Sequence, residues 1–188
     1  EEDAGKSVHD LFPEGTAVDL NRAGVPLIEI VTEPDIRTPA EARAFLQNLK
    51  RTLEYLNVSD CNMEEGSLRV DANVSLRTFG SAALGVKTEV KNLNSFSAVE
   101  KALHREVERQ EGILLSGDKV IQETLLWDER ERTVRPMRSK EESHDYRYFP
   151  DPDLPPLLIE SDRIEHLRDC IPELPHKRKK RLIEEFDL

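Results

Sequence analysis

Several features that would point to particular classes of protein are scarce in this sequence. It holds only two cysteines among 188 residues. Cys61 and Cys170 are too few for a disulfide framework and match no metal-ligand spacing, which favours a reducing compartment. No apolar run approaches the roughly 20 residues that a membrane-spanning helix needs, and we expect no signal peptide. The sequence therefore indicates a soluble protein without disulfide bonds.

Positive charge is scarce as well. The chain has 27 lysines and arginines against 38 aspartates and glutamates, a formal net charge of -11. A protein that holds nucleic acid by general electrostatics needs clustered positive charge, so any RNA contact must be local or made elsewhere. We interpret the one basic run, residues 176–181, as a solvated helix face, with an RNA contact as the alternative. The five histidines show neither ligand spacing nor a nucleophile partner, so we assign no His or Cys catalysis.

Length and composition predict one core followed by a tail. Hydrophobic residues make up 37% of the chain and charged residues 35%, which allows a compact core under a large wet surface. Four prolines between residues 150 and 156 indicate an ordered crossing or a linker, because proline cannot donate to a ladder or sit inside a helix. We place a boundary near Ile171, with one domain over residues 1–170 and the start of a helical tail over residues 171–188.

Local signals predict the helices. The clearest one begins where Thr38 and Glu41 form a capping box and Pro39 takes the first helical position. Apolar residues at helical spacing continue it to Leu56. Further helices are predicted over residues 97–112, 162–169 and 175–186.

Alternating patterns predict the strands. Residues 68–76 alternate strictly between apolar and polar side chains, and residues 86–91 form the antiparallel partner after a loop bracketed by two glycines. Two more hairpins are predicted: residues 16–33, turning at 21–24 with a second strand at 26–32, and residues 120–137. Residues 145–149 are predicted to be extended. The order β-α-β-β-α predicts an α+β fold with a mainly antiparallel sheet.

The polar face of the 68–91 hairpin holds the most informative charges. If the hairpin turns near residues 80–81, Asp71 and Glu89 lie on one face, with Cβ atoms about 5 Å apart if they are directly opposite and about 7 to 8 Å apart on the diagonal. Two such carboxylates repel each other unless a positive group lies between them. One interpretation is a lattice of surface salt bridges with Arg69, Lys87 and Lys91, each worth roughly 0 to 1 kcal/mol.

The other interpretation is a hard cation. Magnesium takes carboxylate oxygens and holds nucleotide phosphates. Glu1 and Glu2 could supply further ligands to it. Arg147, set between aromatic residues, is either a nucleotide or substrate contact or a snorkelling residue on a core edge strand.

Five stretches together resemble one known family. They are EEDAGK at residues 1–6, GVPLIEIV at 24–31, EEGSLRVDAN at 64–73, KTEVKNLNSF at 87–96 and DYRYFP at 145–150. In combination they are similar to GatB, the B subunits of the aspartyl/glutamyl-tRNA amidotransferases. The resemblance implies a cradle-shaped catalytic domain similar to glutamine synthetase and the guanidino kinases, ATP and Mg²⁺ as cofactors, and a heterotrimer with the GatA amidase and GatC.

The resemblance also implies the reaction and the location. ATP phosphorylates the side-chain carboxylate of Glu on tRNA(Gln) or of Asp on tRNA(Asn), and ammonia that GatA releases from glutamine displaces the phosphate. The enzyme is then an ATP-dependent carbon–nitrogen ligase with glutamine as amide donor. Its expected location is the bacterial cytoplasm, or the mitochondrial matrix or chloroplast of a eukaryote.

The resemblance also implies roles for the residues of this sequence that match the family's functional positions. The metal ligands are Glu1, Glu2, Asp71 and Glu89, of which Asp71 and Glu89 are the catalytic candidates. The weaker candidates for phosphate or acceptor contacts are Arg69, Lys87, Lys91 and Arg147. The family's N-terminal ligand strand would precede Glu1, so we expect a fragment that is inactive alone. The alternatives are a docking domain for partner subunits and tRNA without a metal site, or a self-contained ligase of the glutamine synthetase type.

Overall fold

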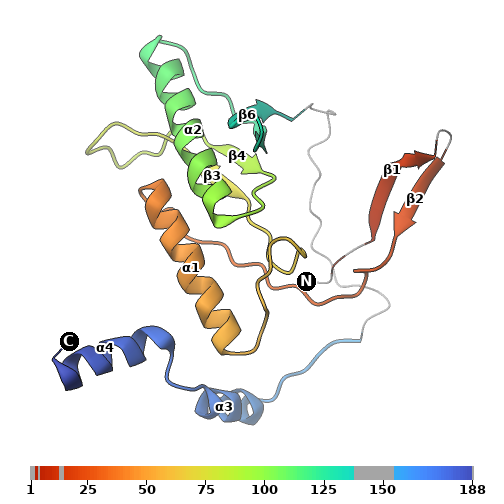
Figure 1. Cartoon of the computed structure of the whole chain (residues 1–188), viewed down its shortest axis with the longest axis vertical. Helices are drawn as coiled ribbons and strands as arrows, with labels where there is room; N and C mark the ends of the chain where they lie inside the picture. The colour runs from red at the N-terminus through yellow and green to blue at the C-terminus, as the bar shows by residue number, and fades with distance from the viewer. Residues whose placement is uncertain (1–2, 4, 13–14, 138–154, 188) are drawn as a thin grey trace. The chain divides into compact units, whose positions relative to one another are not determined.

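The computed structural model describes residues 3, 5–12, 15–137 and 155–187. The chain forms two compact units, Glu1–Ile36 and Arg37–Leu188. Two helices near the C-terminus, α3 (Ser161–Cys170) and α4 (Pro175–Phe186), confirm the helices predicted there (Figure 1). The boundary predicted near Ile171 falls between them and stays a prediction. Of the helices in the described part of the chain, none combines the length and apolarity needed to span a bilayer.

The first unit contains a hairpin that the sequence did not predict. Strand β1 (Lys6–Phe12) pairs antiparallel with β2 (Gly15–Asp19), and the register sets Lys6 opposite Asp19. The strand partner of the residues after Gly15 is therefore the preceding segment and not the following one.

The predicted hairpin over residues 16–33 is wrong for this reason. Residues 21–24 do form a turn, with Gly24 at a φ of 80°. Beyond it the chain returns beside Asp3, whose N–H donates to the Val25 carbonyl at 2.8 Å. Residues 27–33 are not in a strand, and Pro26, which has no N–H, makes only an isolated bridge.

The second unit begins with helix α1 (Pro39–Tyr55), where the predicted capping box is confirmed. The Glu41 N–H donates to Thr38 Oγ1, and the Thr38 N–H donates to Glu41 Oε2, each at 3.1 Å. Two backbone donors at the helix start are thereby satisfied by local residues alone.

A four-stranded sheet in the order β3-β4-β5-β6 forms the centre of this unit. The outer pairs are antiparallel, whereas β4 and β5 run parallel and are joined by helix α2 (Phe96–Leu115). The α+β class is confirmed, and the parallel pair adds to the antiparallel sheet that the sequence predicted. The strands are β3 (Ala72–Val74), β4 (Thr88–Lys91), β5 (Thr124–Asp128) and β6 (Thr133–Pro136).

Helix α2 covers one face of this sheet, and the core lies between them (Figure 1). Val90, Leu125 and Trp127 of the sheet are buried together with Val99 and Ala102 of the helix. The opposite face of the β3–β4 pair is open to solvent, and it carries the charged side chains of the predicted site.

Candidate functional site

The candidate site lies on the solvent-facing side of β3, β4 and β5. The paired strands set Asn73 opposite Glu89 and Ala72 opposite Val90. Continued by one residue, the same register sets Asp71 opposite Lys91, so that Asp71 and Glu89 are diagonal neighbours on one face. The predicted juxtaposition of these two carboxylates is confirmed, although the ladder is shorter than the predicted strand over residues 68–76.

The Lys91 ammonium lies between the two carboxylates. Lys91 Nζ is 3.2 Å from Asp71 Oδ2 and 3.2 Å from Glu89 Oε1. From the next strand, Thr124 Oγ1 donates to Glu89 Oε2 at 3.1 Å. Burial by itself would lower the pKa of Lys91, but the hydrogen bonds and negative charges of the two carboxylates outweigh it and raise that pKa.

These ion pairs contribute little to stability. The side chain of Asp71 is 51% exposed and that of Lys91 is 37% exposed. Water and salt screen charges at such positions, and exposed pairs contribute roughly 0 to 1 kcal/mol. Two carboxylates that share one cation, here the Lys91 ammonium, supply oxygen donors of the kind that magnesium prefers.

The remaining predicted residues are only partly placed. Arg69 and Lys87 are exposed on the segments that lead into β3 and β4. Glu1, Glu2 and Arg147 lie outside the described residues, so their roles stay predictions. Over residues 3, 5–12, 15–137 and 155–187, no three His, Cys, Asp or Glu side chains gather closely enough to hold an ion. Asp71 and Glu89 are two of the four metal ligands that the resemblance implies, and that role stays a prediction.

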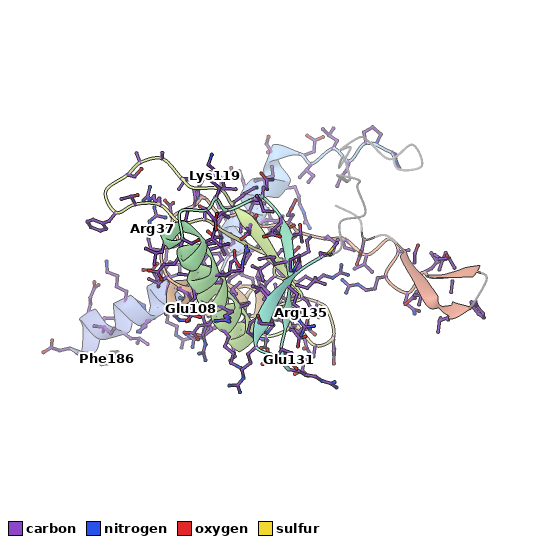
Figure 2. The ribbon with its side chains drawn as sticks, turned by 90° about the horizontal axis from the view of Figure 1, so that it is seen from above. Arg37, Glu108, Lys119, Glu131, Arg135 and Phe186 are labelled. Atoms are coloured by element: carbon purple, nitrogen blue, oxygen red, sulfur yellow. The ribbon has the colours of Figure 1, made fainter. Side chains whose placement is uncertain are left out.

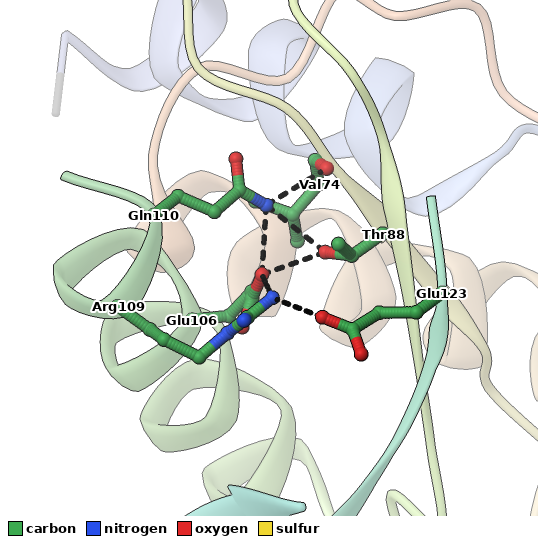
Figure 3. Close-up of polar contacts among 6 residues, drawn as sticks. All are labelled: Val74, Thr88, Glu106, Arg109, Gln110 and Glu123. Carbon is green, nitrogen blue, oxygen red and sulfur yellow. Dashed lines mark hydrogen bonds and ion pairs between the residues drawn. The ribbon is translucent and has the colours of Figure 1, made fainter. Parts of the chain in front are cut away.

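Directly behind the pair, on the buried side of the sheet, lies a polar network that the sequence did not reveal. Its members are Thr88, Glu106, Arg109, Gln110 and Glu123, and we call it the buried network (Figure 3). Thr88, Glu106 and Gln110 are fully buried. Thr88 Oγ1 donates to Glu106 Oε1 at 2.7 Å, and Gln110 Nε2 lies 2.7 Å from the same oxygen.

Arg109 links the network to Glu123, the residue that directly precedes β5. Its Nε donates to Glu106 Oε2 at 2.7 Å, and its Nη2 lies 3.1 Å from Glu123 Oε1. The hydrogen bond to Glu106 is the largest cause of a raised Arg109 pKa, which keeps the guanidinium charged beside the buried carboxylate. A buried carboxylate that lost this partner would be destabilising by about 3 to 5 kcal/mol.

The orientation of the Gln110 amide follows from its surroundings. Its Nε2 faces three acceptors, Val74 O at 3.2 Å, Thr88 Oγ1 at 2.9 Å and Glu106 Oε1. A flipped amide would set oxygen against oxygen. Its Oε1 is buried and has no hydrogen-bond partner among the described residues.

A sequence signal for the buried network does exist. Glu106 and Gln110 extend the buried side of α2 that begins with Val99 and Ala102, and they follow one another at a spacing of four residues. Thr88 occupies an inward position of β4. Three polar residues at core-facing positions of two adjacent elements could have indicated a buried network. The predicted buried face of the helix was instead defined by Leu103 and Val107, which are only partly buried.

Comparison with known proteins gives consistent matches. Residues 1–165 match the family described as the GatB/GatE catalytic domain. The chain is 56% identical over 188 residues to a protein of Caldicellulosiruptor saccharolyticus, 56% over 191 residues to one of Carboxydothermus hydrogenoformans and 57% over 190 residues to one of Moorella thermoacetica. Each of these relatives is named as the B subunit of an aspartyl/glutamyl-tRNA(Asn/Gln) amidotransferase. The matches cover 100% of this chain but only 39 to 40% of each relative.

Proposed function

The chain belongs to the GatB/GatE catalytic-domain family, and on that basis we propose that it is the central part of the catalytic domain of an aspartyl/glutamyl-tRNA amidotransferase B subunit. The sheet and helices α1 and α2 are then part of a larger cradle of the glutamine synthetase type. The proposed partners of the full-length protein are the GatA amidase, GatC and tRNA that is mischarged with Glu or Asp.

The proposed reaction has two steps. A side-chain carboxylate oxygen of Glu on tRNA(Gln) or of Asp on tRNA(Asn) attacks the γ-phosphorus of ATP, and ADP leaves. Ammonia from the GatA amidase then attacks the acyl carbon, phosphate leaves, and the nitrogen loses a proton to give the amide. The first step is needed because ammonia cannot expel oxide from a carboxylate, whereas phosphate is a workable leaving group.

The observation that carries the proposal is the shared cation position of Asp71 and Glu89. In the first step two anions, the ATP phosphates and the substrate carboxylate, must approach each other in line. A bound Mg²⁺ supplies positive charge that neutralises developing negative charge on the phosphoryl oxygens. Asp71 and Glu89 would hold that ion, and the donor set around Lys91 fits it.

The cationic side chains around this position have complementary roles in the proposal. A metal ion held by the two carboxylates would take the place of the Lys91 ammonium, and Lys91 would then be a candidate contact for a phosphate oxygen. Arg69, Lys87 and Arg147 are the further candidates for contacts with phosphate or the tRNA acceptor end. Glu1 and Glu2 are the proposed remaining ligands.

Substitution of the two carboxylates tests this function. In the full-length complex, Asp71→Asn and Glu89→Gln should each weaken Mn²⁺ binding and lower the rate of amide formation by more than about 100-fold, because each removes a charged ligand. Glutamine hydrolysis by the partner amidase should survive. Mn²⁺ titration, an assay of amide formation on mischarged tRNA and a glutaminase assay measure the three effects.

Glu108→Gln supplies a matched control. Glu108 lies on the exposed side of α2 (Figure 2), where it pairs with Arg105. The substitution removes the same charge without touching the sheet, so metal binding and amide formation should stay at the level of the unmodified protein. Normal amide formation by Asp71→Asn or by Glu89→Gln would remove that residue from the metal site.

One observation favours a second candidate function. Because Lys91 already pairs with both Asp71 and Glu89, each carboxylate has a cationic partner without a metal ion. A docking domain for partner subunits and tRNA would need no more than that. This alternative predicts that Mn²⁺ affinity is the same in the unmodified protein and in Asp71→Asn.

A further inference from the structure

Three residues of α2 contact residues on the three strand segments around Glu89. Gln110 Nε2 donates to the Val74 carbonyl, one residue beyond the cross-strand partner of Glu89. Glu106 accepts from Thr88, the residue that precedes Glu89. Arg109 pairs with Glu123, which is next to Thr124.

The segment that Arg109 contacts, Glu123 and Thr124, forms two hydrogen bonds with Glu89. The Glu89 N–H donates to the Glu123 carbonyl at 3.0 Å, and the Glu89 carboxylate accepts from the Thr124 hydroxyl at 3.1 Å. Three chain segments that flank Glu89 are thus tied to one helical turn of α2 (Figure 3).

Stability alone does not account for this arrangement. The rest of the interface between α2 and the sheet is apolar, with Val90, Val99 and Leu125 in its centre. Apolar residues of similar volume in place of a buried ion pair are often neutral or stabilising. The buried Gln110 Oε1, without a partner among the described residues, adds a further unfavourable element. What the polar contacts provide and apolar packing does not is a fixed direction, because hydrogen bonds hold defined atoms at defined angles.

We propose that the buried network positions the Glu89 carboxylate, with Thr88, Glu106 and Gln110 as positioning residues for the candidate metal site. The proposal rests on the proposed function, since Glu89 must ligate a cation for its position to matter. The network fixes the position and direction of β4 relative to β3 and to the start of β5. The position of the Glu89 carboxylate on the opposite face of the sheet follows from that of β4.

Thr88 is the residue at which the test is sharpest. Thr88→Val keeps the shape of the side chain and removes the hydroxyl that bonds β4 to both Glu106 and Gln110. In the full-length complex it should weaken Mn²⁺ affinity by about 10-fold, the lower end of the effect of removing a supporting hydrogen bond around a metal site. Thr88→Ser keeps a hydroxyl and should restore the affinity. The kcat of amide formation should fall with Thr88→Val, whereas KM for mischarged tRNA should stay unchanged.

Two further variants separate the possible outcomes. Val134→Ala opens the same core at β6, which is not adjacent to β4, and should lower thermal stability without changing Mn²⁺ affinity. If Thr88→Val binds Mn²⁺ as well as Val134→Ala does, the network is only structural and the positioning role is wrong. If Glu89→Gln itself leaves Mn²⁺ affinity unchanged, the proposed metal site fails first and the positioning role falls with it.

Discussion

At the scale of single residues, Lys91 is the most informative side chain of the candidate site. It occupies the position between two carboxylates that the proposed metal ion would take, so the two cations would compete. Lys91→Gln should therefore strengthen Mn²⁺ binding in the absence of ATP, by roughly 5- to 10-fold, which corresponds to about 1 kcal/mol for a partly exposed ion pair. Because the ammonium is also proposed to bind phosphate, KM for ATP should rise in the same variant.

A comparison with Lys101→Gln checks that the effect is local. Lys101 pairs with the exposed Glu129, and its loss should change neither the Mn²⁺ affinity nor the KM for ATP.

The raised pKa of Lys91 sets the expected pH dependence. The stability of the ion pair is fully present below the ordinary lysine pKa of about 10.4 and is lost as the pH rises through the higher folded value. The difference between Lys91→Gln and the unmodified protein should thus be constant from about pH 6 to 9, and equal Mn²⁺ affinities there would contradict the competition.

At the scale of elements, the connection between β3 and β4 depends on a glycine. A Cβ built on Gly85 would lie 2.0 Å from the backbone oxygen of Leu76. Gly85→Ala must displace this backbone and should destabilise the chain by about 1 to 3 kcal/mol. Gly112 lies inside α2, and a Cβ there meets nothing within 4 Å, so Gly112→Ala should stabilise it by roughly 0.5 to 1 kcal/mol. Urea unfolding followed by the fluorescence of Trp127, the single and buried tryptophan, measures both. Changes of equal sign would refute the expected contrast.

The elements also show which parts of the fold a sequence can predict. The start of α1 was predictable because Thr38, Pro39 and Glu41 specify it within four residues. The alternation that places Asp71 and Glu89 on one face was predictable because a strand has a period of two. The partner of β2 was not, because a stretch that alternates can pair with the chain before it or after it, and nothing in residues 16–20 distinguishes β1 from the segment after the turn. The parallel neighbour of β4 was missed for the same reason: pairing over a helical crossover leaves no local signal.

The candidate site also has a part that the sequence could predict and a part that it could not. Its exposed half consists of charged residues in an alternating strand, and charge at regular spacing is visible in a sequence. The buried residues proposed to position Glu89, such as Thr88 and Gln110, come together only because α2 lies against β4. Only the packed structure brings them together.

At the scale of the whole molecule, the described residues contribute two carboxylates, Asp71 and Glu89, to a site for which four are proposed. The chain also spans only about two-fifths of the length of the relatives that it matches. The isolated 188-residue chain should therefore not turn over ATP, even where Trp127 fluorescence shows the second unit to be folded. Phosphate release from ATP, with and without mischarged tRNA, measures this. The matched control is the chain with both Asp71→Asn and Glu89→Gln. Turnover that this double variant retains comes from a contaminant, whereas turnover that it abolishes would show that these 188 residues suffice for ATP turnover and that the expected inactivity is wrong.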